Sequence, residues 1–212
     1  PSQESISLMN LLTNLNLASN GLLNLAALLL FGKQPQSYKP QFNIKAVHFK
    51  GNSDTAKEYR DSEDINGKLA QQYVNAMAFI KRNLRKEQNG RNRNTLGESS
   101  IPEDVFEELL VNALIHRDYF ISAPIRLFMF DDRVEIISPG TLPNNLTIEN
   151  VKNGVSNQRN PIIASFATKQ APPMGLPYRG IGTGIKRALS LHPHIQLKND
   201  VENHLFRVVI AG

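Results

Sequence analysis

The sequence of 212 residues contains no cysteine. This absence excludes disulfide bonds and thiolate metal sites, and it is compatible with a reducing compartment. Long hydrophobic runs are absent as well, and the longest, residues 25–31, is too short to span a bilayer. The start of the chain does not have the basic, apolar and cleavage segments of a secretion signal. We therefore expect a cytoplasmic protein with no membrane partner.

The composition is that of an ordinary soluble globular protein, with 41% hydrophobic residues. A chain of this length can form one large domain or two small ones. Its formal net charge of +5 is compatible with nucleic-acid contact but does not by itself indicate it. The chain starts at Pro1 and runs at once into an amphipathic pattern, so we expect a fragment of a longer protein.

Hydrophobic spacing predicts short helices around one strand in the first half of the chain. The predicted elements are a helix over residues 6–15, a turn at Asn20-Gly21, a helix over 24–32, a strand over 43–51 and a helix over 67–84. Residues 85–100 carry no apolar periodicity, which is typical of a linker. We therefore predict two units, residues 1–90 and residues 101–212.

The second half alternates helical and strand patterns. After a helix around residues 107–119, we predict a β-hairpin over 123–140 that turns at Asp131-Asp132, helices over 145–155 and 159–170, a flexible stretch over 171–180, a glycine-rich turn leading to a helix that ends near 191, and strands over 194–199 and 204–211. This mixture of elements predicts an α+β fold.

The most informative segment is the helix around residues 107–119. It is apolar on nearly every side and should be buried. Polar residues nevertheless recur every four positions and form one stripe, made by Asp104, Glu108, Asn112 and His116. Burying such groups is costly unless something pairs with them, and a nucleotide with its metal ion would be a suitable partner. The alternative is that the stripe is simply the solvent-facing edge of the helix.

A second signal is the glycine-rich turn GIGTGI, residues 180–185, which opens directly into an amphipathic helix. Gly180, Gly182 and Gly184 would let the backbone approach a phosphate, and the helix N-terminus behind them offers free N–H groups. A plain turn would explain the same residues. The segment is not a Walker loop, because it lacks the lysine and serine or threonine pair, and it does not fit a dinucleotide-binding unit.

The triplet His116-Arg117-Asp118 also occurs in the catalytic loop of protein kinases, but the other kinase motifs are absent. A favourable interaction of His116 and Arg117 with the dipole of the helix C-terminus fits better. For Arg159, which precedes Asn160-Pro161, a surface or capping contact competes with a contact to phosphate.

Taken in order, these motifs resemble those of the GHKL ATPases, the fold shared by type II topoisomerases, the Hsp90 chaperone, sensor histidine kinases and MutL. The resemblance covers residues 101–212. Within that superfamily, four segments most resemble the RecG-related group of transcriptional regulators: VNALIHRDY, VEIISPGTLP, RNPIIA and GIGTGIKRAL. LNLAALLLFGKQP and IKAVHFKG resemble the part of that group that follows its AlbA-type, Schlafen-like DNA-binding domain. That domain is not visible in this sequence.

The resemblance implies roles for residues at the phosphate end of a nucleotide site. Asn112 would coordinate the Mg²⁺ that bridges the phosphates, and Glu108 would be the catalytic carboxylate that orients the attacking water. Gly180, Gly182 and Gly184 would cradle the phosphates. Such chemistry suits these residues, because Mg²⁺ prefers oxygen ligands and a nearby carboxylate can align a water.

At the adenine end the resemblance is incomplete. Gly140 matches the first glycine of the adenine-side loop, but Ser138 stands where GHKL members have an aspartate that accepts a bond from the adenine amino group. Leu142 replaces the next glycine of the loop. A hydroxyl accepts more weakly than a carboxylate, and the difference is about 1.5–3 kcal/mol.

The resemblance therefore implies a C-terminal GHKL-like two-layer sandwich, a mixed sheet covered on one face by helices, with a smaller α/β region before it. The function it implies is an ATP- and Mg²⁺-binding regulatory module of a DNA-associated transcriptional regulator, with DNA bound through the missing domain. The alternatives are an ATP-hydrolysing enzyme and a degenerate GHKL fold that acts as an oligomerisation or interaction module, for instance in a homo-oligomer. No helicase motor is expected, because no Walker motif is present.

Overall fold

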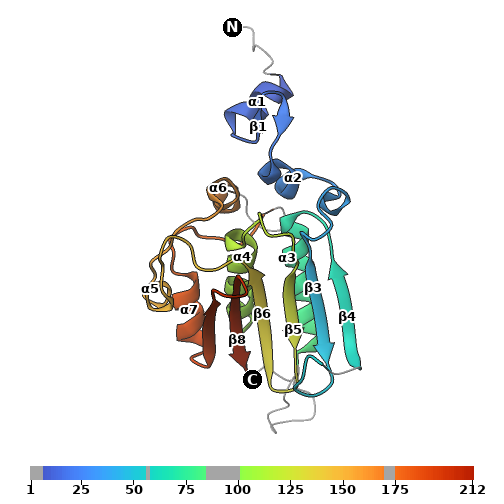
Figure 1. The fold of residues 1–212 in the computed structure, drawn as a ribbon, viewed down its shortest axis with the longest axis vertical. Coiled ribbons are helices and arrows are strands. Elements are labelled where there is room, and N and C mark those ends of the chain that lie inside the picture. The colour runs from blue at the N-terminus through green and yellow to red at the C-terminus, as the bar shows by residue number, and fades with distance from the viewer. Residues whose placement is uncertain (1–6, 56–57, 85–100, 170–174) are drawn as a thin grey trace, which may run out of the picture.

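The computed structural model describes residues 7–55, 58–84, 101–169 and 175–212. Their main feature is a six-stranded sheet with the strand order β4-β3-β5-β6-β8-β7. Helices α3, α4 and α7 lie side by side behind this sheet, as Figure 1 shows. The predicted α+β sandwich, with helices on one face of a mixed sheet, is confirmed.

The strands come from both halves of the chain. They are β3 (Ile44–Phe49), β4 (Tyr59–Ile65), β5 (Ile125–Met129), β6 (Arg133–Pro139), β7 (Ile195–Asp200) and β8 (Leu205–Ala211). Neighbouring strands are antiparallel except β3 and β5, which pair in parallel with Ile44 opposite Ile125. The sheet therefore includes strands from both of the predicted units, residues 1–90 and residues 101–212. The division of the chain into these two units stays a prediction.

The helices follow the apolar periodicity of the sequence. They are α3 (Leu69–Asn83), α4 (Glu103–His116), α5 (Ile148–Lys152), α6 (Pro161–Lys169) and α7 (Gly184–Leu191). Helix α4 is the central one, and eight of its side chains are buried. It ends at His116, three residues earlier than its pattern suggested, because Arg117 already has extended backbone angles. Its predicted burial is confirmed.

The N-terminal residues form short elements, of which α2 packs on the main core through Leu29. Helix α1 (Leu8–Asn14) is followed by the paired strands β1 (Ala18–Ser19) and β2 (Leu22–Leu23), then by α2 (Leu25–Phe31) and a 3₁₀ turn at Pro35–Ser37. Asn20 and Gly21 both have positive φ, as a two-residue hairpin turn requires, so the predicted turn is confirmed.

The core lies between the helices and one face of the sheet. Alternate strand residues such as Ile125, Leu127 and Met129 point into it, and α4 contributes Val105, Leu109 and Leu110 from the other side. This alternation is what a sheet with one covered face requires.

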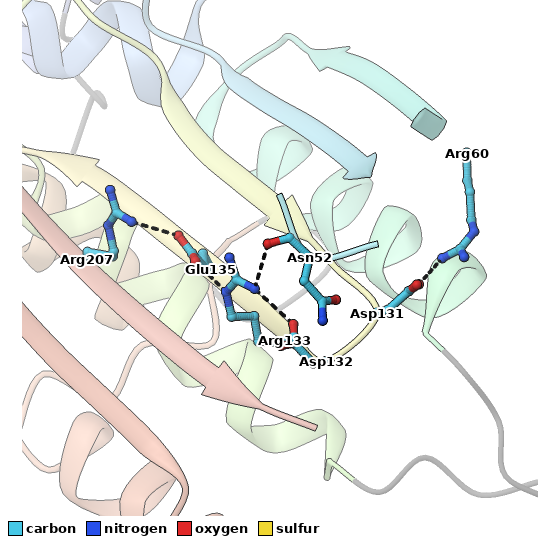
Figure 2. A network of polar contacts seen from close by, with 7 residues as sticks. All are labelled: Asn52, Arg60, Asp131, Asp132, Arg133, Glu135 and Arg207. Carbon is cyan, nitrogen blue, oxygen red and sulfur yellow. Dashed lines mark hydrogen bonds and ion pairs between the residues drawn. The ribbon is translucent and has the colours of Figure 1, made fainter. Parts of the chain in front are cut away.

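The opposite face of the sheet carries a network of charged side chains, drawn in Figure 2. Glu135 on β6 is buried, and it accepts hydrogen bonds from Arg133 at 2.7 Å and from Arg207 on β8 at 3.1 Å. Arg133 also bonds Asp132 and the carbonyl of Asn52. The two arginines satisfy the buried carboxylate, as burial of a charge requires.

Strand β4 is not predicted by the sequence, because its residues YRDSEDI are polar and lack an apolar alternation. It forms by pairing with β3 at the edge of the sheet, where both faces can remain solvated. The predicted linker over 85–100 and residues 171–174 of the predicted flexible stretch over 171–180 lie outside the described residues. Residues 175–180 belong to no helix or strand, and their flexibility stays a prediction.

Candidate functional site

One pocket lies between α4, β6, the loop after β6 and the turn that leads into α7. Every residue predicted for the site lines it: Glu108, Asn112, Ser138, Gly140, Gly180, Gly182 and Gly184. Their convergence in one pocket is confirmed, whereas the role of each stays a prediction. His116 lines the same pocket and Asp104 is exposed, so three of the four stripe residues face the pocket.

The tightest point of the pocket is the contact between α7 and α4. A Cβ atom on Gly184 would overlap Oε2 of Glu108 and lie 2.9 Å from Nδ2 of Asn112. A larger residue at this position would displace the ends of these two polar side chains from the start of α7. The glycine turn and the polar stripe, which are distant in sequence, thus form one continuous wall.

The amide of Asn112 has a fixed orientation. Its Nδ2 donates a hydrogen bond of 2.7 Å to the backbone carbonyl of Glu108, one turn earlier in α4. No hydrogen bond to its Oδ1 is found among the described residues. This oxygen is therefore an available acceptor, or metal ligand, at the wall of the pocket.

Glu108 has a partner that sequence reasoning missed. Its carboxylate forms an ion pair with Nη2 of Arg187 on α7, and the Glu108 side chain is only 11% exposed. The available signal was a cation three positions after Gly184, one turn into the helix. Arg187 also lines the pocket, and among the described residues its Nε is buried without a partner.

Ser138 lies at the other end of the pocket. It is buried on β6, and its hydroxyl donates a long hydrogen bond of 3.4 Å to the carbonyl of Ala113. The lining around it is apolar and includes Leu109, Ile136, Leu142, Phe206 and Val208. The pocket therefore has a polar end at α7 and an apolar end with one hydroxyl at β6.

His116 and Tyr178 both line the pocket and contact each other edge to face, with ring centroids 6.3 Å apart. The Tyr178 hydroxyl lies 3.4 Å from Nε2 of His116. Burial lowers the pKa of His116 to about 4, and the positive charge of Arg159 adds to this effect. His116 is therefore neutral near pH 7 and can accept or donate a hydrogen bond there.

The loop after β6 is held by the segments next to α4 and α6. Asp118 donates its backbone N–H to the carbonyl of Pro139 at 2.8 Å, and its carboxylate accepts from Arg159. Arg159 also bonds the carbonyl of Thr141. Asn160 Nδ2 donates to the carbonyls at the end of α4. Arg159 therefore forms an ion pair and a loop contact with Asp118 and Thr141, and the side chain that caps α4 is that of the neighbouring Asn160.

Arg117 has a different environment from the one expected. It is 2% exposed, its guanidinium lies over the rings of Phe42 and Tyr119, and it donates to the carbonyls of Ile121 and Ala123. The expected interaction with the end of α4 is therefore not its main contact. Arg117 instead fixes the segment that leads from α4 into β5, so the kinase-like triplet is a packing motif here.

Neither a metal cluster nor a membrane helix is found in the described parts of the chain. No group of three or more histidine, cysteine, aspartate or glutamate side chains there could hold a metal ion. Within the same ranges, no helix is long and apolar enough to cross a bilayer. A metal ion at this pocket would therefore need oxygen ligands from a bound molecule in addition to Asn112.

Comparison with known proteins gives one family match and a structural likeness. Residues 122–209 match the family described as "Putative ATP-dependent DNA helicase recG C-terminal". This match covers less than half of the chain; it includes Ser138, Gly140 and the glycine turn but not Glu108 or Asn112 on α4. No curated protein matches the chain.

The structural likeness covers nearly the whole chain. The crystal structure of the DIP2311 protein from Corynebacterium diphtheriae superposes on 98% of it with a TM-score of 0.73, at 19% sequence identity. The chain spans about two fifths of the length of that structure, since 41% of it is covered. The likeness shows a shared fold, and residues 122–209 are similar to a RecG-related, ATPase-like domain.

Proposed function

We propose that the pocket binds an adenine nucleotide together with Mg²⁺, and that the chain is a regulatory module of a DNA-associated transcriptional regulator. The observation that carries the proposal is the convergence of Gly184, Glu108 and Asn112 at one end of a pocket that also has apolar lining residues on α4, β6 and β8. The ATPase-like family match over residues 122–209 supports it from sequence.

The polar end of the pocket suits the phosphates of the nucleotide. The N-terminus of α7 offers free backbone N–H groups and the positive end of the helix dipole, and Arg187 adds a positive charge. Asn112 Oδ1 would supply one ligand to Mg²⁺, with the phosphates and waters supplying the others, as this ion commonly prefers. When bound, the metal would neutralise phosphate charge next to Glu108.

The apolar end suits the base. A planar purine would lie among Leu109, Ile136 and Val208, and the Ser138 hydroxyl would be the polar group at its edge. Small-molecule sites are commonly lined in this way, with few polar groups that set orientation. Because Ser138 is uncharged, we expect adenine binding to be weaker than with a carboxylate at this position.

The alternative of an ATP-hydrolysing enzyme has one observation in its favour and one against it. Glu108 lies at the polar end, where a carboxylate could orient a water. It is, however, paired with Arg187 while the pocket is empty, and the uncharged Ser138 predicts weak binding of the nucleotide on which it would act. We therefore propose slow or undetectable hydrolysis, and regulation rather than turnover as the main activity.

The test is a calorimetric titration of the protein with ATP and ADP, with and without Mg²⁺, followed by a hydrolysis assay. Asn112→Ala should abolish the Mg²⁺ dependence and weaken binding about tenfold or more, whereas Asn153→Ala, an exposed residue outside the pocket, should change neither. Flat titrations for the unmodified protein and for Ser138→Asp would instead support a degenerate fold that serves as an interaction module.

The proposed association with DNA derives from the resemblance to RecG-related regulators, in which an AlbA-type domain would bind the DNA. We expect that this sequence alone has no preference for particular duplex sequences at physiological salt. Tight and sequence-specific binding by this chain in a competition assay would contradict that expectation.

A further inference from the structure

The ion pair between Arg187 and Glu108 lies at the point where the proposed phosphates would bind. Both side chains line the pocket, one from α7 and one from α4. Gly184 is one turn before Arg187, and it packs directly on Glu108 and Asn112. An anionic ligand at the start of α7 would therefore meet the Arg187 guanidinium and the Glu108 carboxylate together.

The two charges respond to such a ligand in opposite ways. A phosphate attracts the guanidinium and repels the carboxylate, so it competes with Glu108 for the same cation. The Arg187 side chain is 30% exposed, and among the described residues its Nε has no partner. It therefore has an unused donor, and it can leave Glu108 without losing a full set of hydrogen bonds.

We propose that Arg187 recognises the terminal phosphate of the nucleotide and that Glu108 holds this arginine while the pocket is empty. The inference rests on the proposed function, because it concerns the ligand of the same pocket. Arg187 is then the residue that distinguishes a nucleoside triphosphate from a diphosphate. Binding of the triphosphate also releases Glu108 from its ion pair, so the carboxylate becomes available only when the terminal phosphate is present.

The charge and the position of Arg187 together favour the terminal phosphate over the inner phosphates. An arginine-phosphate hydrogen bond is charge-assisted and stronger than a neutral one. Gly180 and Gly182 lie on the turn before α7, where the inner phosphates would contact backbone. Arg187 lies one turn further along α7, beside Glu108, and is the next group that a longer phosphate chain would reach.

The experiment compares ADP with the non-hydrolysable ATP analogue that has an imido bridge, both with Mg²⁺, by calorimetry. We expect the unmodified protein to prefer the analogue by about ten- to a hundredfold. In Arg187→Gln this preference should fall close to one, while ADP affinity changes by less than about threefold. Lys186→Gln is the matched control, because Lys186 is an exposed cation on the same helix that does not line the pocket.

A second pair of variants tests the competition by Glu108. Glu108→Gln frees Arg187 and should tighten binding of the analogue severalfold without tightening ADP. The double variant Glu108→Gln with Arg187→Gln should lose this gain. If Arg187→Gln alone does not fold, because it leaves Glu108 buried and unpaired, the comparison of these two variants carries the test.

The outcomes separate the two proposals. Equal weakening of both ligands by Arg187→Gln would mean that the arginine only shapes the pocket, and it would overturn the inference but not nucleotide binding. An unchanged preference would overturn the inference as well. Absence of binding of either ligand to the unmodified protein would overturn the proposed function itself.

Discussion

Arg159, at the start of α6, donates a hydrogen bond of 2.5 Å from Nη1 to the carboxylate of Asp118, which follows α4. Both side chains are about one fifth exposed, at 19% and 21%. Gly140 lies directly against them, because a Cβ atom at this glycine would be 2.6 Å from Cβ of Asp118. The pair therefore fixes the loop at the apolar end of the pocket.

This relationship predicts strong coupling between the two residues. Asp118→Asn and Arg159→Gln should each destabilise the fold, and the double variant should cost less than the sum of the two. A double-mutant cycle from urea unfolding should give a coupling energy of about 1–2 kcal/mol. Additive effects within about 0.3 kcal/mol would show that the contact contributes nothing to stability.

The uncharged hydroxyl of Ser138 predicts that the pocket binds adenine and guanine nucleotides with similar affinity. A hydroxyl can donate to the carbonyl of guanine as well as accept from the amino group of adenine, so ATP and GTP should bind within about tenfold of each other. In Ser138→Asp the carboxylate should tighten ATP binding and weaken GTP binding. Ser190→Asp, on the exposed side of α7, is the matched control. A strict ATP preference in the unmodified protein would contradict this prediction.

His116 predicts a pH dependence of stability. The unfolded chain binds a proton on this ring near pH 6.5, whereas the folded protein does so only near pH 4. Between these values the unfolded state holds more protons, so stability falls as the pH falls through this window. The unmodified protein should lose about 1–2 kcal/mol more than His116→Gln between pH 7 and pH 5. Parallel stability curves for the two proteins would show that His116 is not the cause.

Arg117 predicts a large loss of stability on substitution. Replacement by methionine keeps much of the packing against Phe42 and Tyr119 but leaves the carbonyls of Ile121 and Ala123 without their donor. We expect a loss of about 2–4 kcal/mol in the free energy of unfolding. Arg179→Met, at an exposed position, should change stability by less than about 0.5 kcal/mol.

Much of the fold and part of the pocket could be predicted from local sequence patterns, whereas Ser138 and Gly140 were assigned to the site only through the family resemblance. The four-residue spacing placed Glu108, Asn112 and His116 on one face, and three glycines before an amphipathic run placed the turn at the start of α7. Strand β4 could not be predicted in this way, since its polar residues gain their structure only from pairing with β3.

The pairing of Arg187 with Glu108 was also beyond sequence reasoning. It depends on how α7 crosses α4, which is set by long-range packing and not by any local spacing. The same holds for Arg117. Its position in the sequence suggested an interaction with a helix C-terminus, but one of the two rings under its guanidinium belongs to Phe42, which is far away in the sequence.

The parallel pairing of β3 with β5 has a consequence for aggregation. In the intact sheet β4 is the edge strand next to β3, and its charged residues discourage pairing with another chain. A truncated protein that began at residue 101 would instead expose β5, with the apolar sequence IRLFM, as a bare edge. Such an edge is a template for strand addition between molecules. Strands β3 and β4 thus protect β5 from pairing with another molecule.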